Sequence, residues 1–201
     1  MTTLYLDCTH GARKDSFAQG VSALLPREEA RRIERAAGIS EHADEHTAAH
    51  HHHSVAEVHQ MIQAKPLPAA AREAALGVYG VLAQAEARAH GVTLEEVHFH
   101  EVGSAEAVSW VCYACAAVAA LAADEVVASP VRTGFGFVDC AHGRLPIPAP
   151  ATANVLEDIP TFAGDAEGEL TTPTGAALVS WFASRFADEA PAGCELIAQV
   201  G

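Results

Sequence analysis

Basic residues are scarce in this sequence. Lysine and arginine together number 12 against 26 aspartates and glutamates, and the formal net charge at pH 7 is −14. A negative surface of this kind repels phosphate backbones and anionic lipid headgroups, and it raises the local concentration of divalent cations. We therefore expect no nucleic-acid partner and no membrane partner, whereas a cationic ligand is compatible with the charge.

Long apolar stretches are also missing. The longest, residues 111–123, is shorter than the roughly 20 residues that a membrane-spanning helix needs. Residues 1–7 carry no basic segment followed by a long apolar core, so we expect no signal peptide. Cysteine is limited to five scattered residues, an odd number that favours reduced thiols over a disulfide framework. The sequence therefore predicts a cytoplasmic protein.

Alternating helical and strand patterns indicate the fold class. The expected helices are two segments within residues 15–37, one that begins after Ser54, and residues 69–90, 104–123, 151–156 and 174–186. The expected strands are residues 3–6, 96–102, 125–129, 131–138 and 194–200. This order predicts an α/β fold, a single domain over residues 1–201 in which helices flank a mixed sheet. Residues 39–53 lack apolar periodicity and are expected to form a mobile histidine-rich loop.

Histidines are concentrated in and beside this loop. Seven of the twelve lie between His42 and His59, and four are consecutive: His50, His51, His52 and His53. Neutral imidazole is a good ligand for nickel, zinc and copper, and a flexible cluster can offer several nitrogens without a preformed cage. We expect this histidine tract, together with His46, to capture a transition-metal ion. The alternatives are a purification-tag remnant and an ordinary polar loop.

A second histidine group lies in the segment His98-Phe99-His100-Glu101. In a strand, period-two alternation places both imidazoles on one face, with their Cα atoms roughly 6.5 Å apart. Two imidazoles at that spacing can bind one ion, although a third ligand must come from elsewhere. The alternative is a pair of solvent-facing histidines on an edge strand.

Hydroxyl groups are clustered at the start of the last expected helix, in the segment Thr171-Thr172-Pro173-Thr174-Gly175. Side-chain hydroxyls and unpaired backbone N–H groups at such a position suit a phosphate or a carboxylate. Ordinary helix capping accounts for the same residues equally well. Cys112 and Cys115 have a metal-binding spacing, but they lie inside an alanine-rich helix without a second cysteine pair, so we expect buried thiols.

Several sequence blocks, taken in order, resemble the LarC family of nickel insertion proteins. They are Tyr5-Leu6-Asp7, the histidine tract, residues 96–103 (EVHFHEVG), His142-Gly143 with residues 146–152 (PIPAPAT), and residues 169–177 (ELTTPTGAA). The resemblance covers nearly the whole chain. Members of that family insert nickel into pyridinium-3,5-bisthiocarboxylic acid mononucleotide, which gives the nickel-pincer cofactor of lactate racemase and related enzymes. The resemblance therefore implies a nickel-inserting lyase that uses Ni²⁺ and cytidine triphosphate (CTP).

The resemblance also implies roles for individual residues. The histidine tract would collect Ni²⁺, and His98 and His100 would hold it near the organic acceptor. Residues at the start of the last helix would bind the phosphate of the mononucleotide: Thr171, Thr172, Thr174 and Gly175. Insertion removes a carbon-bound proton, so Glu101 or Asp7 is expected to act as the base. The implied partners are the mononucleotide, a C-terminal LarC-like half, and further copies of the chain in a homo-oligomer.

Other positions depart from the family pattern. Of the opening motif, Asp7, Gly11 and Asp15 are kept, whereas the positions around them hold other residues: His10, Arg13, Lys14 and Ser16. Of two acids usual after residue 103, Glu106 is present and Trp110 replaces the other. Two further interpretations therefore stay open. One is a protein that delivers or stores nickel without catalysis, and the other is a divergent relative that binds another phosphorylated ligand.

Overall fold

The central β-sheet has four parallel strands. The computed structural model describes residues 1–39, 53–140 and 143–201. The strand order is β10-β1-β4-β9, with bounds β1 (Thr3–Asp7), β4 (Glu125–Ala128), β9 (Arg185–Phe186) and β10 (Leu196–Gln199). Leu4, Tyr5 and Leu6 of β1 are all buried, so both faces of this strand are covered. An apolar strand of this kind occupies the interior of the sheet.

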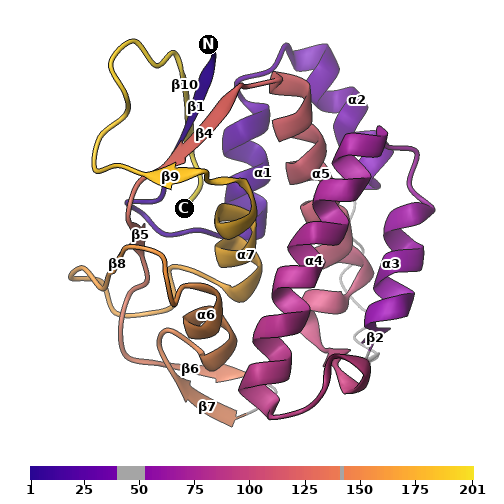
Figure 1. Ribbon diagram of the computed structural model, residues 1–201, viewed down its shortest axis with the longest axis vertical. Coiled ribbons are helices and arrows are strands. Elements are labelled where there is room, and N and C mark those ends of the chain that lie inside the picture. Colours follow the sequence, from indigo (N-terminus) through magenta and orange to yellow (C-terminus); the bar gives the residue numbers. More distant parts are fainter. Residues whose placement is uncertain (40–52, 141–142) are drawn as a thin grey trace.

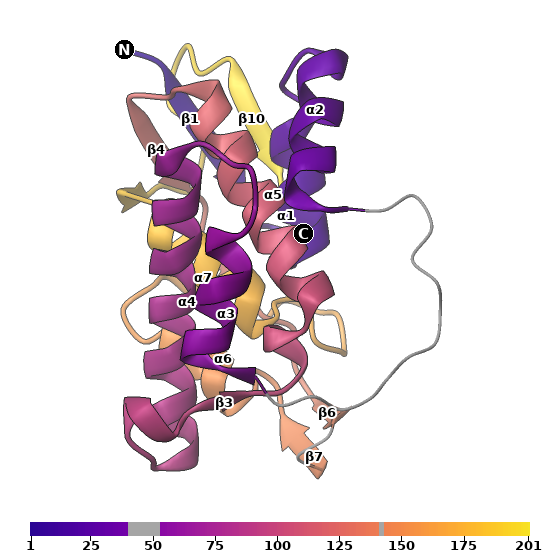
Figure 2. The same ribbon diagram turned by 90° about the vertical axis from the view of Figure 1, so that its right-hand side faces the viewer.

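Helices form a layer beside the sheet (Figures 1 and 2). Their bounds are α1 (Lys14–Ser22), α2 (Arg27–Ala37), α3 (Val55–Gln63), α4 (Ala69–His90), α5 (Ala105–Leu121), α6 (Pro150–Val155) and α7 (Pro173–Phe182). Helix α1 contacts both β10 and α5, while α4 contacts α3, α5, α6 and α7. Many buried positions of α4 and α5 are alanine, and these small side chains let the helices approach closely. The sheet and the helices enclose one hydrophobic core.

Three two-stranded ribbons lie outside the central sheet (Figures 1 and 2). They are the antiparallel pair β2 (His53–Ser54) and β3 (His98–Phe99), the parallel pair β5 (Val131–Arg132) and β8 (Thr161–Phe162), and the antiparallel pair β6 (Phe137–Cys140) and β7 (Gly143–Pro146). Two short 3₁₀ helices flank β3, namely η1 (Leu94–Glu96) and η2 (Glu101–Gly103). Of the polar residues singled out in the sequence, His53, His98 and Glu101 lie in these ribbons and turns, and His100 lies between β3 and η2.

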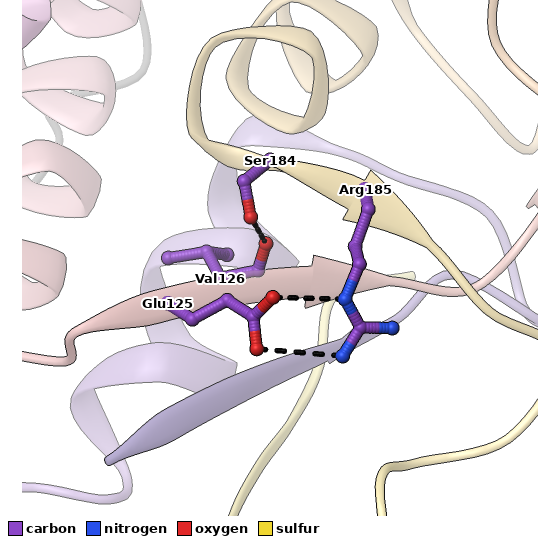
Figure 3. Close-up of polar contacts among 4 residues, drawn as sticks. All are labelled: Glu125, Val126, Ser184 and Arg185. Carbon is purple, nitrogen blue, oxygen red and sulfur yellow. Dashed lines mark hydrogen bonds and ion pairs between the residues drawn. The ribbon is translucent and has the colours of Figure 1, made fainter. Parts of the chain in front are cut away.

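Side-chain contacts fix the edge strand β9 to β4 (Figure 3). The Ser184 hydroxyl donates to the Val126 carbonyl at 2.8 Å. The guanidinium of Arg185 donates to both carboxylate oxygens of Glu125, at 2.8 and 3.3 Å. These bonds set the register of a strand only two residues long.

The α/β fold class is confirmed, and antiparallel pairing among the described residues is confined to the small ribbons. The predicted helix start after Ser54 is confirmed too. The Ser54 hydroxyl accepts the Glu57 N–H, and the Glu57 carboxylate accepts the Ser54 N–H. Cys112 and Cys115 are buried as expected, and burial raises the pKa of the Cys112 thiol to about 11.

Two predicted strands were wrong in extent. In segment 96–102 only His98 and Phe99 are in a strand, because η1, which begins with a capping box at Thr93, precedes them and η2 follows them. His100 has φ −86° and ψ −106°, outside the extended region, so the simple alternation of His98 and His100 on one strand face does not occur. Segment 131–138 is divided into β5 and β6 because Gly134 and Gly136 adopt positive φ values of 75° and 105°.

The described cysteines and helices agree with two further expectations from composition. Among the residues that the structure describes, every cysteine whose side chain is placed is free: Cys8, Cys112, Cys115 and Cys194. Within those same ranges, each helix is too short or too polar to cross a membrane.

Candidate functional site

A cavity of about 500 Å³ lies where the ends of several elements meet. Its walls come from the start of α1, the end of α4, the β3-η2 segment, the β6-β7 ribbon and the starts of α6 and α7. Polar side chains that line it include Lys14, Glu86, His90, His100, Glu101, Glu169, Thr172 and Thr174. Residues far apart in the sequence thus meet at one hollow. Concave sites with a few convergent polar groups are the usual form of a ligand site.

The start of α7 contributes hydroxyl groups to this cavity. Thr172 and Thr174 both line it. The Thr172 hydroxyl also caps the helix, because it accepts the Gly175 N–H at 3.3 Å. Helix N-termini present N–H groups and a partial positive charge, so this wall suits an anionic group.

Thr171 and Gly175 hold the start of α7 in place and do not line the cavity. The buried Thr171 hydroxyl donates to the Arg132 carbonyl at 2.7 Å and accepts the Ala12 N–H at 3.0 Å. A Cβ on Gly175 would lie 2.0 Å from the carbonyl oxygen of Ala12, so only glycine lets α7 approach the loop after β1. Of the four residues predicted to bind phosphate, the structure therefore places two at the cavity and two behind it.

Carboxylates occupy another part of the cavity wall. Glu101, the predicted base, lines the cavity together with Glu169. Burial raises the pKa of the Glu169 carboxyl, the negative charge of Glu101 raises it further, and Arg13 lowers it. A carboxyl group with a raised pKa in a cavity is suited to accepting and releasing protons. Sequence reasoning gave Glu169 no role, because its burial becomes visible only when α7 is packed.

Asp7, the other predicted base, lies elsewhere. It ends β1, and its Oδ1 accepts the Thr9 N–H at 3.0 Å while its Oδ2 accepts a hydrogen bond from Gln199 Nε2, also at 3.0 Å. Asp7 lines neither this cavity nor the hollow described next. Its hydrogen bonds stabilise the turn after β1 and tie that turn to β10.

A second hollow, of about 540 Å³, adjoins the histidines. His98 and His100 both line it, together with His90 from the last turn of α4, and Glu96 lies on its rim of mostly exposed residues. The ring centroids of His90 and His100 are 6.3 Å apart. Over residues 1–39, 53–140 and 143–201, no group of three or more His, Cys, Asp or Glu side chains is already arranged around a single metal position. His90 was not among the metal ligands predicted from the sequence, because its spacing from His98 matches no ligand motif.

The described end of the histidine tract lies beside this second hollow. His53 pairs with Phe99 and Ser54 pairs with His98 in the β2-β3 ribbon. A Cβ on Gly103 would lie 3.4 Å from Cβ of His53, so His53 also packs near the start of α5. The other predicted metal ligands of the tract, His46, His50, His51 and His52, lie outside the described residues. The ribbon brings the C-terminal end of the tract next to His98.

Comparisons with known proteins agree on one family. The family described as "Nickel insertion protein" matches residues 4–199. A "Pyridinium-3,5-bisthiocarboxylic acid mononucleotide nickel insertion protein" of Staphylococcus saprophyticus is 46% identical over 136 residues, which is 68% of this chain and 35% of the relative. Proteins of the same name from Desulfitobacterium hafniense and Akkermansia muciniphila are 42% and 41% identical, over 68% and 66% of this chain and 34% and 32% of their own lengths. No solved structure matches the chain significantly. The chain thus matches about a third of each relative.

Proposed function

Because the chain belongs to the nickel insertion protein family, we propose that it takes part in inserting nickel into pyridinium-3,5-bisthiocarboxylic acid mononucleotide. The relatives carry this activity in their names. The observation that carries the proposal is the cavity, which is lined by hydroxyls at the start of α7, by two glutamates and by His100. Since the match covers about a third of the relatives, we assign the complete reaction to this chain acting with a C-terminal half.

Nickel is a substrate of the proposed reaction. Ni²⁺ forms one bond to each thiocarboxylate sulfur and one to the pyridinium carbon between them, and that carbon loses its hydrogen as a proton. A base must accept this proton. We assign Glu101 as the base because it lines the cavity, whereas Asp7 does not. Glu169 lines the same cavity and, with its raised pKa, is a second acceptor for the proton.

The mononucleotide phosphate is assigned to the start of α7. Thr172 and Thr174 offer hydroxyls there, and Lys14 lines the same cavity from the start of α1. An ammonium group and a helix N-terminus together offset the repulsion that the acidic walls exert on a phosphate. Thr171 and Gly175 support this position from behind. The phosphate would then anchor the substrate while its pyridinium ring lies nearer the glutamates.

Further parts of the proposal concern partners and location. We assign CTP as the co-substrate, bound mainly through the C-terminal half, and we expect the assembled protein to be a homo-oligomer. The reaction is assigned to the cytoplasm, where the free thiols of the described cysteines would stay reduced. Each of these assignments is open to direct test.

The deciding experiment mixes the chain with Ni²⁺, CTP and the bisthiolated mononucleotide, with and without the C-terminal half of a relative. Mass spectrometry then measures the nickelated product. We expect product only when the C-terminal half is present. Product from the chain alone would show that the C-terminal half is dispensable, and no product in either mixture would overturn the proposed function.

Nickel delivery without catalysis is a second candidate function. The observation that favours it is the outer hollow, whose histidines His90, His98 and His100 lie together at the surface. A delivery protein binds Ni²⁺ and stimulates product formation by a complete relative, yet its glutamate variants leave that stimulation unchanged. An insertion protein loses activity when Glu101 is replaced.

A further inference from the structure

The two hollows share part of their walls. His90 and His100 line both the inner cavity and the outer hollow. His98 lines only the outer hollow and is exposed, while Glu101 and Glu169 line only the inner cavity. The two imidazoles therefore link the exposed His98 of the outer hollow to the glutamates of the inner cavity.

The positions of the two shared histidines follow from different elements. His90 is in the last turn of α4, where Glu86 Oε2 lies 3.5 Å from its Nε2 and one turn before it. His100 follows β3 and precedes η2, with a backbone conformation that turns the chain out of the strand. Their ring centroids are 6.3 Å apart. At this separation, modest side-chain rotation suffices for both rings to reach one ion, because an imidazole nitrogen binds a metal at about 2.0–2.1 Å.

We propose that His90 and His100 form a transfer point through which Ni²⁺ passes from the outer histidine hollow to the inner cavity. His98 receives the ion at the surface, His90 and His100 bind it next, and the thiocarboxylates of the substrate remove it in the cavity. This inference rests on the proposed nickel insertion. It adds His90, and the direction of metal movement, to that function.

Ligand chemistry supports this direction. Ni²⁺ prefers imidazole nitrogen and sulfur to carboxylate oxygen. The histidines therefore provide successive binding sites, and the sulfurs of the substrate provide the last site, which binds the ion more tightly. An ion held by two imidazoles keeps water in its other positions and exchanges readily. Transport through a protein needs sites that bind well enough to load and weakly enough to release. Glu86 beside His90 attracts the cation without replacing the imidazole.

Nuclear magnetic resonance of the whole chain, labelled with ¹³C-histidine, tests the transfer point without an activity assay. Ni²⁺ is paramagnetic and broadens the signals of nearby imidazoles. Substoichiometric Ni²⁺ is expected to broaden His90, His98 and His100 together and to leave the exposed His10 sharp, since His10 lines neither hollow. The measurement is repeated with His50, His51 and His52 replaced by asparagine, which removes metal bound at the tract. A sharp His90 signal beside broadened His98 and His100 signals overturns the inference.

Nickel dependence of product formation is the second measurement. In the mixture with the C-terminal half, His90→Asn is expected to raise the Ni²⁺ concentration for half-maximal rate by about tenfold or more, with little change in the maximal rate. His10→Asn is the matched control and keeps the wild-type dependence. Wild-type dependence in His90→Asn overturns the inference and leaves the proposed function standing. If the wild-type chain gives no product in this mixture, the proposed function is overturned. The nuclear magnetic resonance measurement then tests by itself whether His90 and His100 bind Ni²⁺.

Discussion

Glu101 and Glu169 line the same cavity, and the charge of Glu101 adds to the effect of burial in raising the pKa of Glu169. Glu101 begins η2 in the middle of the chain, and Glu169 precedes α7. The fold therefore places an exposed glutamate, Glu101, and a half-buried one, Glu169, in the lining of one cavity. Because the pairing disfavours the ionised form of Glu169 in the folded protein, it also has a cost in stability.

The stability cost predicts a pH-dependent effect of Glu169→Gln. A carboxyl whose pKa is raised on folding contributes stability below its unfolded pKa, and that contribution is lost as the pH rises through its folded pKa. Glutamine carries no charge at any pH. We therefore expect the melting temperature of the variant to match the wild type at about pH 4 and to exceed it at about pH 7. Glu95→Gln, at an exposed position, is the control; an equal difference at both pH values would contradict the explanation.

Substitution of the two candidate bases separates their roles. Glu101→Gln is expected to lower the rate of product formation by about 10²–10⁴-fold while nickel binding is kept, because it removes the proton acceptor. Asp7→Asn keeps the shape of the turn after β1 and is expected to cost about 1 kcal/mol of folding free energy with the rate largely retained. Rate measurements and chemical denaturation of both variants test this. A rate loss in Asp7→Asn but not in Glu101→Gln would indicate that Asp7, at the end of β1, is the base.

Histidine substitutions distinguish the tract from the ordered pair. Replacing both His98 and His100 by asparagine removes ligands that line the outer hollow, so product formation is expected to fall at every nickel concentration. If the tract only collects the ion, replacing His50, His51 and His52 by asparagine is expected to raise the nickel requirement without lowering the maximal rate. Nickel titrations of the rate compare the two. Unchanged nickel stoichiometry and product formation in the first variant would remove His98 and His100 from the site.

Threonine substitutions at the start of α7 separate binding from support. Thr171→Val leaves the Arg132 carbonyl and the Ala12 N–H without their hydroxyl partner, at an expected cost of about 1–3 kcal/mol of folding free energy. Thr174→Val keeps the side-chain volume but removes a hydroxyl from the cavity wall, so it is expected to weaken binding of the mononucleotide. Denaturation curves and binding isotherms measure the two effects. Equal losses of stability in both variants would argue against a separate role for Thr174.

Local sequence signals located most elements of this protein. Helix α4 occupies residues 69–90 as predicted, because helical periodicity, a preceding proline and a following glycine all act within a few residues. The capping box at Ser54 is equally local. Strand β3 was predicted too long because the turns at Thr93 and after Phe99 compete with strand pairing, and alternation alone does not reveal that competition.

The site was only partly visible in the sequence. Sequence motifs identified two groups of candidate site residues because each group is contiguous along the chain. One group is His98, His100 and Glu101, and the other is the threonines at the start of α7. Glu169, Lys14 and His90 join them only after α1, α4 and α7 pack together, so their burial and charge coupling depend on contacts between distant segments. In the packed structure Asp7 lies outside the cavity and bonds to Gln199. Thr171 and Gly175 lie behind the cavity wall and hold the start of α7 in place. Sequence by itself determined the elements and the family resemblance, because both depend on residue order; the tertiary structure decided which side chains share a wall, because that depends on distance in space.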